Sequence, residues 1–202
     1  RCQPFIDADV PIFIDKPLCD NLSDLEIFQK WIGEGKNFIS SSAMRYCKEY
    51  EPYHLSTHEL GDLRYVNITM AKSWEKYGIH ALETVYPIVG PGFDSVQNIG
   101  DKNRNIVHLH HSKGIDINIA NISDMLGGFG LISLMGPKGG IQIKSTDTYY
   151  AFKKQLQSYV NYLQTGHKPV PWNETYELMQ LVSAGIESRE KGGIKITLNK
   201  DK

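Results

Sequence analysis

The chain has 202 residues, of which 41% are hydrophobic and 22% charged, and its formal net charge is −1. These values are typical of a globular protein with one large domain or two small ones. The sequence contains no block of basic residues and no run of eighteen apolar residues, which argues against nucleic acid and membrane as partners. Three cysteines without C-x-x-C spacing favour a reducing compartment, and we expect a cytoplasmic location.

The N-terminal part of the sequence predicts a β-α-β unit. The apolar run VPIFID, residues 10–15, is typical of a buried strand of the parallel type. Asp20 or Asn21 can cap a helix over about residues 22–34, because these side chains accept from free backbone N–H groups. The segment NFISSSA then predicts a second strand. Strand, helix and strand in this order belong to a doubly wound sheet.

The rest of the chain predicts an antiparallel sheet with helices. Residues 44–60 look mostly helical, residues 62–74 alternate as a strand, and residues 77–89 have helical periodicity. Short β-prone segments joined by turns then predict an antiparallel meander, over residues 94–99, 105–112, 116–122, 129–136 and 140–144. Two helices, over residues 148–163 and 173–190, and a strand over residues 194–198 complete the chain.

A composition change near Ser42 predicts two domains, residues 1–42 and residues 43–202. The predicted fold class is therefore α+β. A β-α-β unit precedes an α/β domain with a large, mostly antiparallel sheet, one face of which is open.

Lys16 is the first candidate site residue, because it stands at the carboxyl end of the first predicted strand. Ligands of open α/β sheets bind outside these strand ends. Pro17 disfavours helical geometry for the residue before it, which keeps Lys16 extended. A cation there can polarise a substrate oxygen or donate a proton. The alternative is a surface lysine followed by a helix-starting proline.

His80 is the second candidate, in the first turns of a helix that follows a strand. Glu83 lies three residues later, so both side chains point the same way. An acid near a histidine can fix its tautomer and raise its basicity, which makes His80 a candidate general base. A core or capping histidine is the alternative.

Four segments, FIDKPL, FISSSAMRY, KYGIHALE and LVSAGIESREKGGIKITL, occur in the order seen in the Gfo/Idh/MocA oxidoreductases. The chain resembles this family over about residues 10–198. The resemblance implies an NAD(P)-dependent oxidoreductase of a sugar, polyol or related hydroxy compound. It also implies that residues 1–42 are the end of a Rossmann dinucleotide-binding domain and residues 43–202 a substrate-binding domain. A homodimer or higher oligomer would form through the antiparallel sheet.

The resemblance also implies roles for single residues. Lys16 matches the lysine of the family's Glu-Lys-Pro signature, between nicotinamide and substrate, and Asp15, Lys16 and Pro17 are the implied cofactor-binding residues. His80 matches the histidine that takes the proton of the substrate hydroxyl, so Lys16 and His80 are the implied catalytic pair. Many relatives carry an aspartate where this chain has Lys76. The usual Asp–His pair therefore cannot form there, which leaves the roles of Lys16, Lys76 and His80 open and favours an unusual substrate.

Further polar and aromatic residues adjoin the predicted crevice. Arg45 and Tyr77 suit a polyol substrate, which needs hydrogen bonds and apolar contact, and they join Lys76 and His80 as predicted substrate contacts. Arg45 and Tyr77 could equally be structural.

The run HLHH, residues 108–111, is a candidate metal site because histidines are common metal ligands. On a strand, His108 and His110 share one face and His111 points to the other. Two ligands need a third and fourth from elsewhere, and no motif offers them, so we predict no metal.

A glycine-rich turn is needed between the first strand and helix of a dinucleotide-binding domain, so that the pyrophosphate can meet the helix N-terminus. The nearest candidate, GGFGLI with Gly128 and Gly130, lacks the third glycine and leads into a strand. The family fold would place the turn before Arg1, so we expect this chain alone to bind NAD or NADP weakly and to be inactive. The alternative function is a non-catalytic ligand-binding or assembly protein of the same family.

Overall fold

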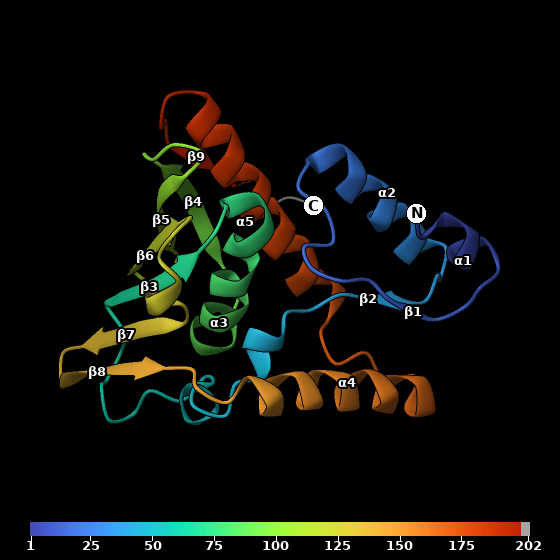
Figure 1. The fold of residues 1–202 in the computed structure, drawn as a ribbon, viewed down its shortest axis with the longest axis horizontal. Coiled ribbons are helices and arrows are strands. Elements are labelled where there is room, and N and C mark those ends of the chain that lie inside the picture. The colour runs from blue at the N-terminus through green and yellow to red at the C-terminus, as the bar shows by residue number, and fades with distance from the viewer. Residues whose placement is uncertain (199–202) are drawn as a thin grey trace.

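The computed structural model describes residues 1–198, and Figure 1 shows the arrangement of its elements. The N-terminal unit consists of α1 (Gln3–Asp7), β1 (Ile12–Phe13), α2 (Leu22–Gly33) and β2 (Phe38–Ile39). β1 and β2 pair in parallel, which confirms the predicted β-α-β unit. Helix α2 begins where the sequence predicts it, because the Asn21 side chain accepts from Asp24 N at 2.8 Å.

The first strand is shorter and less buried than its apolar sequence predicts. Its ladder covers only residues 12 and 13, both half-buried, and Val10 is 45% exposed. Within residues 1–198, β2 is the single ladder neighbour of β1. A parallel strand is buried on both faces only when neighbouring strands and helices flank it. The predicted buried strand over residues 10–15 is therefore wrong in length and in burial.

A seven-stranded sheet forms the centre of the molecule, in the order β8-β7-β3-β6-β5-β4-β9. The strands are β3 (Tyr65–Ala71), β4 (Phe93–Asn98), β5 (Arg104–His111), β6 (Ile115–Ile122), β7 (Leu131–Gly136), β8 (Gly139–Lys144) and β9 (Ile196–Thr197). Every pairing is antiparallel except that of β3 with β6. This confirms the predicted α+β class with a mostly antiparallel sheet.

The predicted meander is confirmed only in two pieces. Strands β4, β5 and β6 follow one another as hairpins, and so do β7 and β8. Between β6 and β7, however, lies β3, parallel to the former and antiparallel to the latter. Val66, Ile68 and Met70 of β3 are fully buried. A strand with such a buried face gains from a central position, which explains why β3 divides the meander.

The segment after β2 is not the predicted helix over residues 44–60. It contains two 3₁₀ turns, Ala43–Tyr46 and Glu51–Tyr53, joined by irregular backbone. Separate hydrogen bonds hold the two turns of this segment. The Ser42 side chain caps the first turn, and buried Tyr50 donates to the Gly130 carbonyl. Pro52 lacks an N–H group for a continuing helix. The prediction is wrong because these tertiary anchors outweigh helix propensity.

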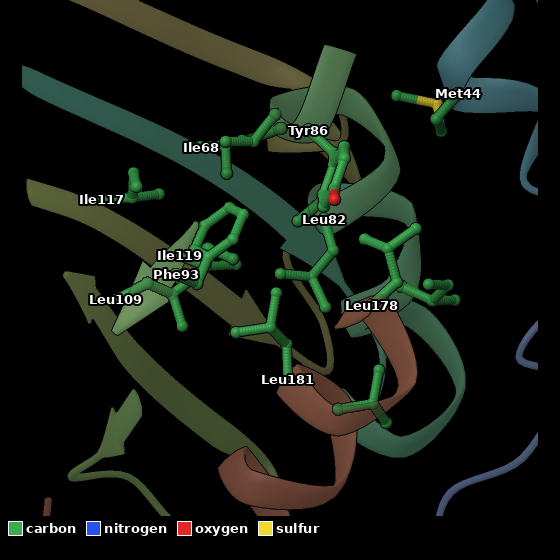
Figure 2. Close-up of a cluster of buried hydrophobic side chains, with 14 of the residues drawn as sticks. Met44, Ile68, Leu82, Tyr86, Phe93, Leu109, Ile117, Ile119, Leu178 and Leu181 are labelled. Carbon is green, nitrogen blue, oxygen red and sulfur yellow. The ribbon is translucent and has the colours of Figure 1, made fainter. Parts of the chain in front are cut away.

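Helices α3 (Ile79–Val89) and α5 (Trp172–Glu190) cover one face of the sheet (Figure 1). Both lie close to their predicted positions. Their apolar sides meet inward-facing residues of the strands, and Figure 2 shows this core around Leu82, Leu178 and Leu181. The sheet's other face carries mostly polar, partly exposed side chains.

A π-helical turn, Trp74–Gly78, leads into α3 and is locked by Trp74. The indole is fully buried, and its Nε1 donates to Val182 O of α5 at 2.9 Å. Gly78 and Gly185 both lie directly against the ring, since an added Cβ at either would come within 2.5 Å of an indole atom. This packing fixes the start of α3 against α5.

Helix α4 (Thr148–Thr165) ties the N-terminal unit to the rest. Tyr159 donates to Pro11 O at 3.0 Å, and Gln155 donates to Ser41 O at 2.6 Å. One hydrophobic cluster includes residues from both sides of Ser42, so the division into two domains remains a prediction. None of the helices within residues 1–198 is long and apolar enough to cross a membrane.

Candidate active site

Lys16 and the start of α3, two segments that carry predicted site residues, meet in the structure. The Lys16 ammonium donates to Lys76 O at 3.2 Å and lies 4.3 Å from the centroid of the Tyr77 ring. The Lys16–Pro17 peptide is cis. Burial lowers the pKa of Lys16, and the charge of Lys72 acts in the same direction, against the opposing effects of Tyr77 and Asp15. The end of β1 thus presents a half-buried cation to the turn before α3.

Tyr77 is bound by a second ammonium, that of Lys72. The Lys72 Nζ donates to the Tyr77 hydroxyl at 2.7 Å and lies 4.4 Å from the ring centroid. This hydrogen bond, together with the charge of Lys16, lowers the pKa of Tyr77. Sequence reasoning missed Lys72. Its signal is its position directly after β3, since strand ends are where such sheets bind ligands.

His80 lies buried at the start of α3, beside Lys16 and Tyr77. Its ring centroid is 4.9 Å from that of Tyr77 and 5.7 Å from that of Phe129. Burial, followed by the charges of Lys16 and Lys72, lowers the pKa of His80 to about 3. The histidine is therefore uncharged at neutral pH.

Ser42, and not Glu83, orients the His80 ring. A 2.6 Å hydrogen bond joins Ser42 Oγ to His80 Nδ1 and leaves Nε2 for other partners. Glu83 instead accepts from Ser42 N at 3.1 Å and pairs with Arg45. The expected direct contact of Glu83 with His80 is wrong. Glu83 is connected to the histidine indirectly, because it binds the backbone N–H of Ser42 and the Ser42 side chain binds His80. Sequence reasoning missed the contact of Ser42 with His80, because the two residues lie 38 positions apart.

Arg45 is largely buried and is connected to His80 through Glu83 and Ser42. Its guanidinium pairs with Glu83 and, at 3.0 Å, with Glu174 of α5. Both carboxylates come from helices that cover the sheet, so Arg45 joins α3 to α5. The predicted substrate contact of Arg45 stays a prediction. Lys76 is exposed one turn before His80 and stays a predicted contact as well.

The glycine-containing segment before β7 contributes to the site in an unexpected way. It leads into a strand, as predicted, and Phe129 within it packs on both Tyr77 and His80. Gly130 has a φ of 71°, a left-handed conformation that suits glycine. The segment thus supplies an apolar wall. Sequence reasoning missed Phe129, because only the fold brings it to α3.

The histidines of β5 divide between the two faces of the sheet as predicted. His108 and His110 both bind Asp116 Oδ1, at 2.9 and 3.2 Å, on the open face. His111 is buried on the other face and binds Gly90 O at 3.2 Å. Across residues 1–198, no group of three histidine, cysteine or acidic side chains is arranged to hold a metal.

We expect the low pKa of His80 to make the folded protein sensitive to acid. The unfolded chain binds a proton near pH 6.5, whereas the folded chain binds it near pH 3. Stability that is present above pH 6.5 is therefore lost as the pH falls, at up to about 1.4 kcal/mol per pH unit. Chemical unfolding between pH 7 and pH 4 should show a steeper loss for the wild type than for His80→Gln. Equal slopes would contradict this expectation.

We expect Lys72→Met to raise the pKa of Tyr77 toward the ordinary tyrosine value of about 10. The substitution removes the hydrogen bond that is the largest cause of the lowered pKa. The ¹³Cζ signal of Tyr77, followed by NMR during a pH titration, measures the change. Exposed Lys138 is the matched control, since Lys138→Met removes a charge on the β7–β8 hairpin. An unmoved midpoint in Lys72→Met would refute the hydrogen bond.

Solved structures resemble the whole described chain. Myo-inositol dehydrogenase from Corynebacterium glutamicum ATCC 13032 superposes with a TM-score of 0.80 at 19% identity, over 98% of this chain and 78% of that chain. The enzyme from Lactobacillus casei, solved with NAD(H) and myo-inositol, has a TM-score of 0.78 at 16% identity, over 98% and 73%. GenD2 from gentamicin A biosynthesis, solved with NAD, has a TM-score of 0.84 at 14% identity, over 98% and 74%.

The chain has the fold of the myo-inositol dehydrogenases. This confirms, at the level of the fold, the resemblance to the Gfo/Idh/MocA oxidoreductases. No family model and no curated protein matches the sequence. At 14–19% identity the superpositions establish how the chain folds, and the chemistry has to be argued from the residues themselves.

Proposed function

We propose that the protein is an NAD- or NADP-dependent oxidoreductase that oxidises a hydroxyl of a sugar or polyol, or reduces the matching carbonyl. The observation that carries this proposal is the meeting of Lys16, at the end of β1, with Tyr77 and His80 at the start of α3. Neighbouring structures that hold NAD(H) and myo-inositol support it. Alcohol oxidation needs a group that takes the O–H proton and an acceptor for the hydride, and a bound nicotinamide supplies the second.

Each site residue has a role in this proposal. The Lys16 ammonium polarises the substrate oxygen, because it is half-buried and its attraction for that oxygen is weakly screened. His80 accepts the hydroxyl proton at Nε2, while its Nδ1–H donates to Ser42 Oγ. Ser42 is a positioning residue. Lys76 and Tyr77 contact the other oxygens of the substrate.

The residues around Lys16 fit only one end of a dinucleotide. Asp15, Lys16 and Pro17 lie at a strand end beside His80, where a nicotinamide would meet the substrate. Residues 14–21, between β1 and α2, contain no glycine, so this connection offers no pyrophosphate cradle. We therefore propose that this chain by itself binds the dinucleotide weakly.

Nicotinamide absorbance with a panel of inositols and sugars tests the function in an extended protein, in which this chain is joined to a complete dinucleotide-binding domain, because the chain by itself binds the dinucleotide weakly. We expect turnover with at least one polyol, and a loss of about 100-fold or more in Lys16→Ala and His80→Ala, because each removes a group that acts on the reacting oxygen. Lys138→Ala is the control for the loss of a lysine. Equal turnover of Lys16→Ala and the control would overturn the assigned site.

The alternative is a non-catalytic ligand-binding or assembly protein with the same fold. The low pKa of His80 favours it, because such a histidine is a weak base. A titration with NADH and NADPH followed by fluorescence, beside polyol binding by calorimetry, separates the two. Polyol binding without dinucleotide binding or turnover in the extended protein would support the alternative.

We also propose a cytoplasmic homodimer or higher oligomer that pairs through the open face of the sheet. This face carries Ile106, which is 37% exposed, among polar residues that include Asn118. Light scattering after gel filtration should report at least a dimer, and Ile106→Glu should reduce it to a monomer, because the substitution places a charge in the contact. A monomeric wild type would refute this pairing.

A further inference from the structure

Two lysine ammoniums lie together at the candidate site, and exposed Lys76 is close to them through its backbone. The ammoniums of Lys16 and Lys72 lie 4.3 and 4.4 Å from one ring centroid, that of Tyr77. Lys76 directly precedes Tyr77, and its backbone carbonyl accepts a hydrogen bond from the Lys16 ammonium. Within residues 1–198, none of the three lysines forms an ion pair with an acid. The repulsion between Lys16 and Lys72 is therefore not relieved by salt bridges.

The two acids close in sequence to Lys76 and His80 form ion pairs with arginines. Glu75 pairs with Arg189 of α5 at 2.5 Å, and Glu83 pairs with buried Arg45. The charge of Asp15 raises the pKa values of both Lys16 and Tyr77, but it is smaller than the summed charge of the lysines. The site thus carries an excess of positive charge.

The backbone at Lys72 gives a second, independent indication of a binding role. Its φ is 66°, a left-handed conformation that side-chain-bearing residues rarely adopt. Buried Asn121 holds this conformation by donating to the carbonyls of Ala71 and Lys72, at 2.9 and 2.8 Å. Conformations of this kind persist where the surrounding structure enforces them, often at ligand-binding positions. Lys72 in this conformation donates its ammonium to the Tyr77 hydroxyl, and no acid within residues 1–198 forms an ion pair with it.

We propose that the substrate of this site is an anionic polyol, with a carboxylate or phosphate held by Lys72 and Lys76 while Lys16 and His80 address the reacting hydroxyl. This inference rests on the proposed function and names the substrate class. The Tyr77 oxygen accepts from Lys72, so its O–H donates to the ligand. Phe129 packs against the same ring and supplies apolar contact for the carbon chain.

An anion also makes the proposed proton transfer easier. The charges of Lys16 and Lys72 help to keep the His80 ring uncharged. A carboxylate or phosphate beside the lysines offsets these charges and so favours the protonated ring. A neutral polyol has no such effect, and His80 stays a weak base with it. Substrate charge and proton transfer are coupled in this arrangement.

Three matched probes test the substrate class: neutral D-glucitol, D-gluconate and D-glucitol 6-phosphate. Binding is followed by the amide signals of residues 72–80 in ¹H–¹⁵N NMR spectra of the 202-residue chain. We expect at least one anionic probe to bind about fivefold or more tightly than glucitol, with an advantage that shrinks in high salt. Comparison of gluconate with the phosphate identifies which anion the lysines hold. The same probe should raise the pH at which His80 titrates, and glucitol should not.

Variants decide whether the lysines cause the preference. Lys72→Met and Lys76→Met should each weaken binding of the anionic probe about three- to tenfold, and should weaken glucitol binding clearly less. Lys138→Met should change neither. Equal binding of all three probes, no signal change with either anion at tens of millimolar, or unchanged anion binding in both variants would each overturn the proposal.

The two proposals fail in different ways. Turnover of neutral polyols without any preference for an anion would overturn the substrate class and leave the oxidoreductase function intact. Lysine-dependent anion binding by this chain, without turnover of any probe by the extended protein, would support the anionic site and overturn the oxidoreductase function. The binding experiment does not depend on the dinucleotide, so either result is interpretable.

Discussion

Replacing Arg45 by methionine should lower the free energy of unfolding by about 3–5 kcal/mol, the largest effect that we expect from a single substitution in this chain. The guanidinium pairs with Glu83, which is 2% exposed, and with Glu174. Methionine fills similar space but leaves the Glu83 carboxylate without its cation. Chemical unfolding at pH 7 measures the loss.

The pH dependence of this loss identifies its cause. Burial raises the pKa of Glu83 more than Arg45 can offset. Without Arg45 that pKa rises further, so the acid is more often neutral in the folded state at low pH. The cost of Arg45→Met should therefore be smaller at pH 5 than at pH 7, and a cost that grows toward acid would contradict an unpaired carboxylate.

Two further variants serve as controls for Arg45→Met. The double variant with Glu83→Gln leaves no buried charge and should be more stable than Arg45→Met alone. Lys48→Met breaks an exposed ion pair with Asp147 and should cost at most about 1 kcal/mol. Because Glu83 holds Ser42, Arg45→Met should also loosen the bond between Ser42 and His80, which the His80 ¹⁵N signals would report.

Replacing Gly185 by alanine should also destabilise the protein, by about 1–3 kcal/mol, although alanine is the better helix former. The added Cβ would lie 2.5 Å from Trp74 Nε1 and 2.7 Å from a ring carbon. The indole cannot easily move away, because Gly78 lies against its other edge and Nε1 is bound to Val182 O. Thermal and chemical unfolding measure the change.

Gly33 is the matched control for Gly185. It is the last residue of α2, and an added Cβ there would meet no atom within 4 Å. Gly33→Ala should therefore leave stability unchanged or raise it by up to about 1 kcal/mol. If Gly185→Ala were as stable as Gly33→Ala, α5 would have to shift away from the indole. The turn that carries Tyr77 would then have lost its anchor, with altered near-ultraviolet dichroism as the sign.

The sequence by itself determined most helices and strands of this fold. Helical periodicity predicts α2, α3, α4 and α5 close to their observed bounds, and alternating apolar residues predict the strands from β3 to β8. It also indicated Lys16 and His80 as candidate site residues, because the residues around each resemble a family motif, and their roles stay predictions. These features depend on neighbours a few positions apart, whose effect on backbone conformation does not require the rest of the fold.

Only the tertiary structure decided how these pieces meet. The place of β3 between β6 and β7, the irregular path of residues 44–60 and the ion pairs of Arg45 depend on partners tens of residues away. The same holds for Ser42, Lys72 and Phe129, which reach the site from three separate segments. Burial of apolar faces selects which segments lie side by side, and it acts on the whole chain at once. A local sequence pattern therefore cannot predict that this serine, lysine and phenylalanine contact His80 or Tyr77.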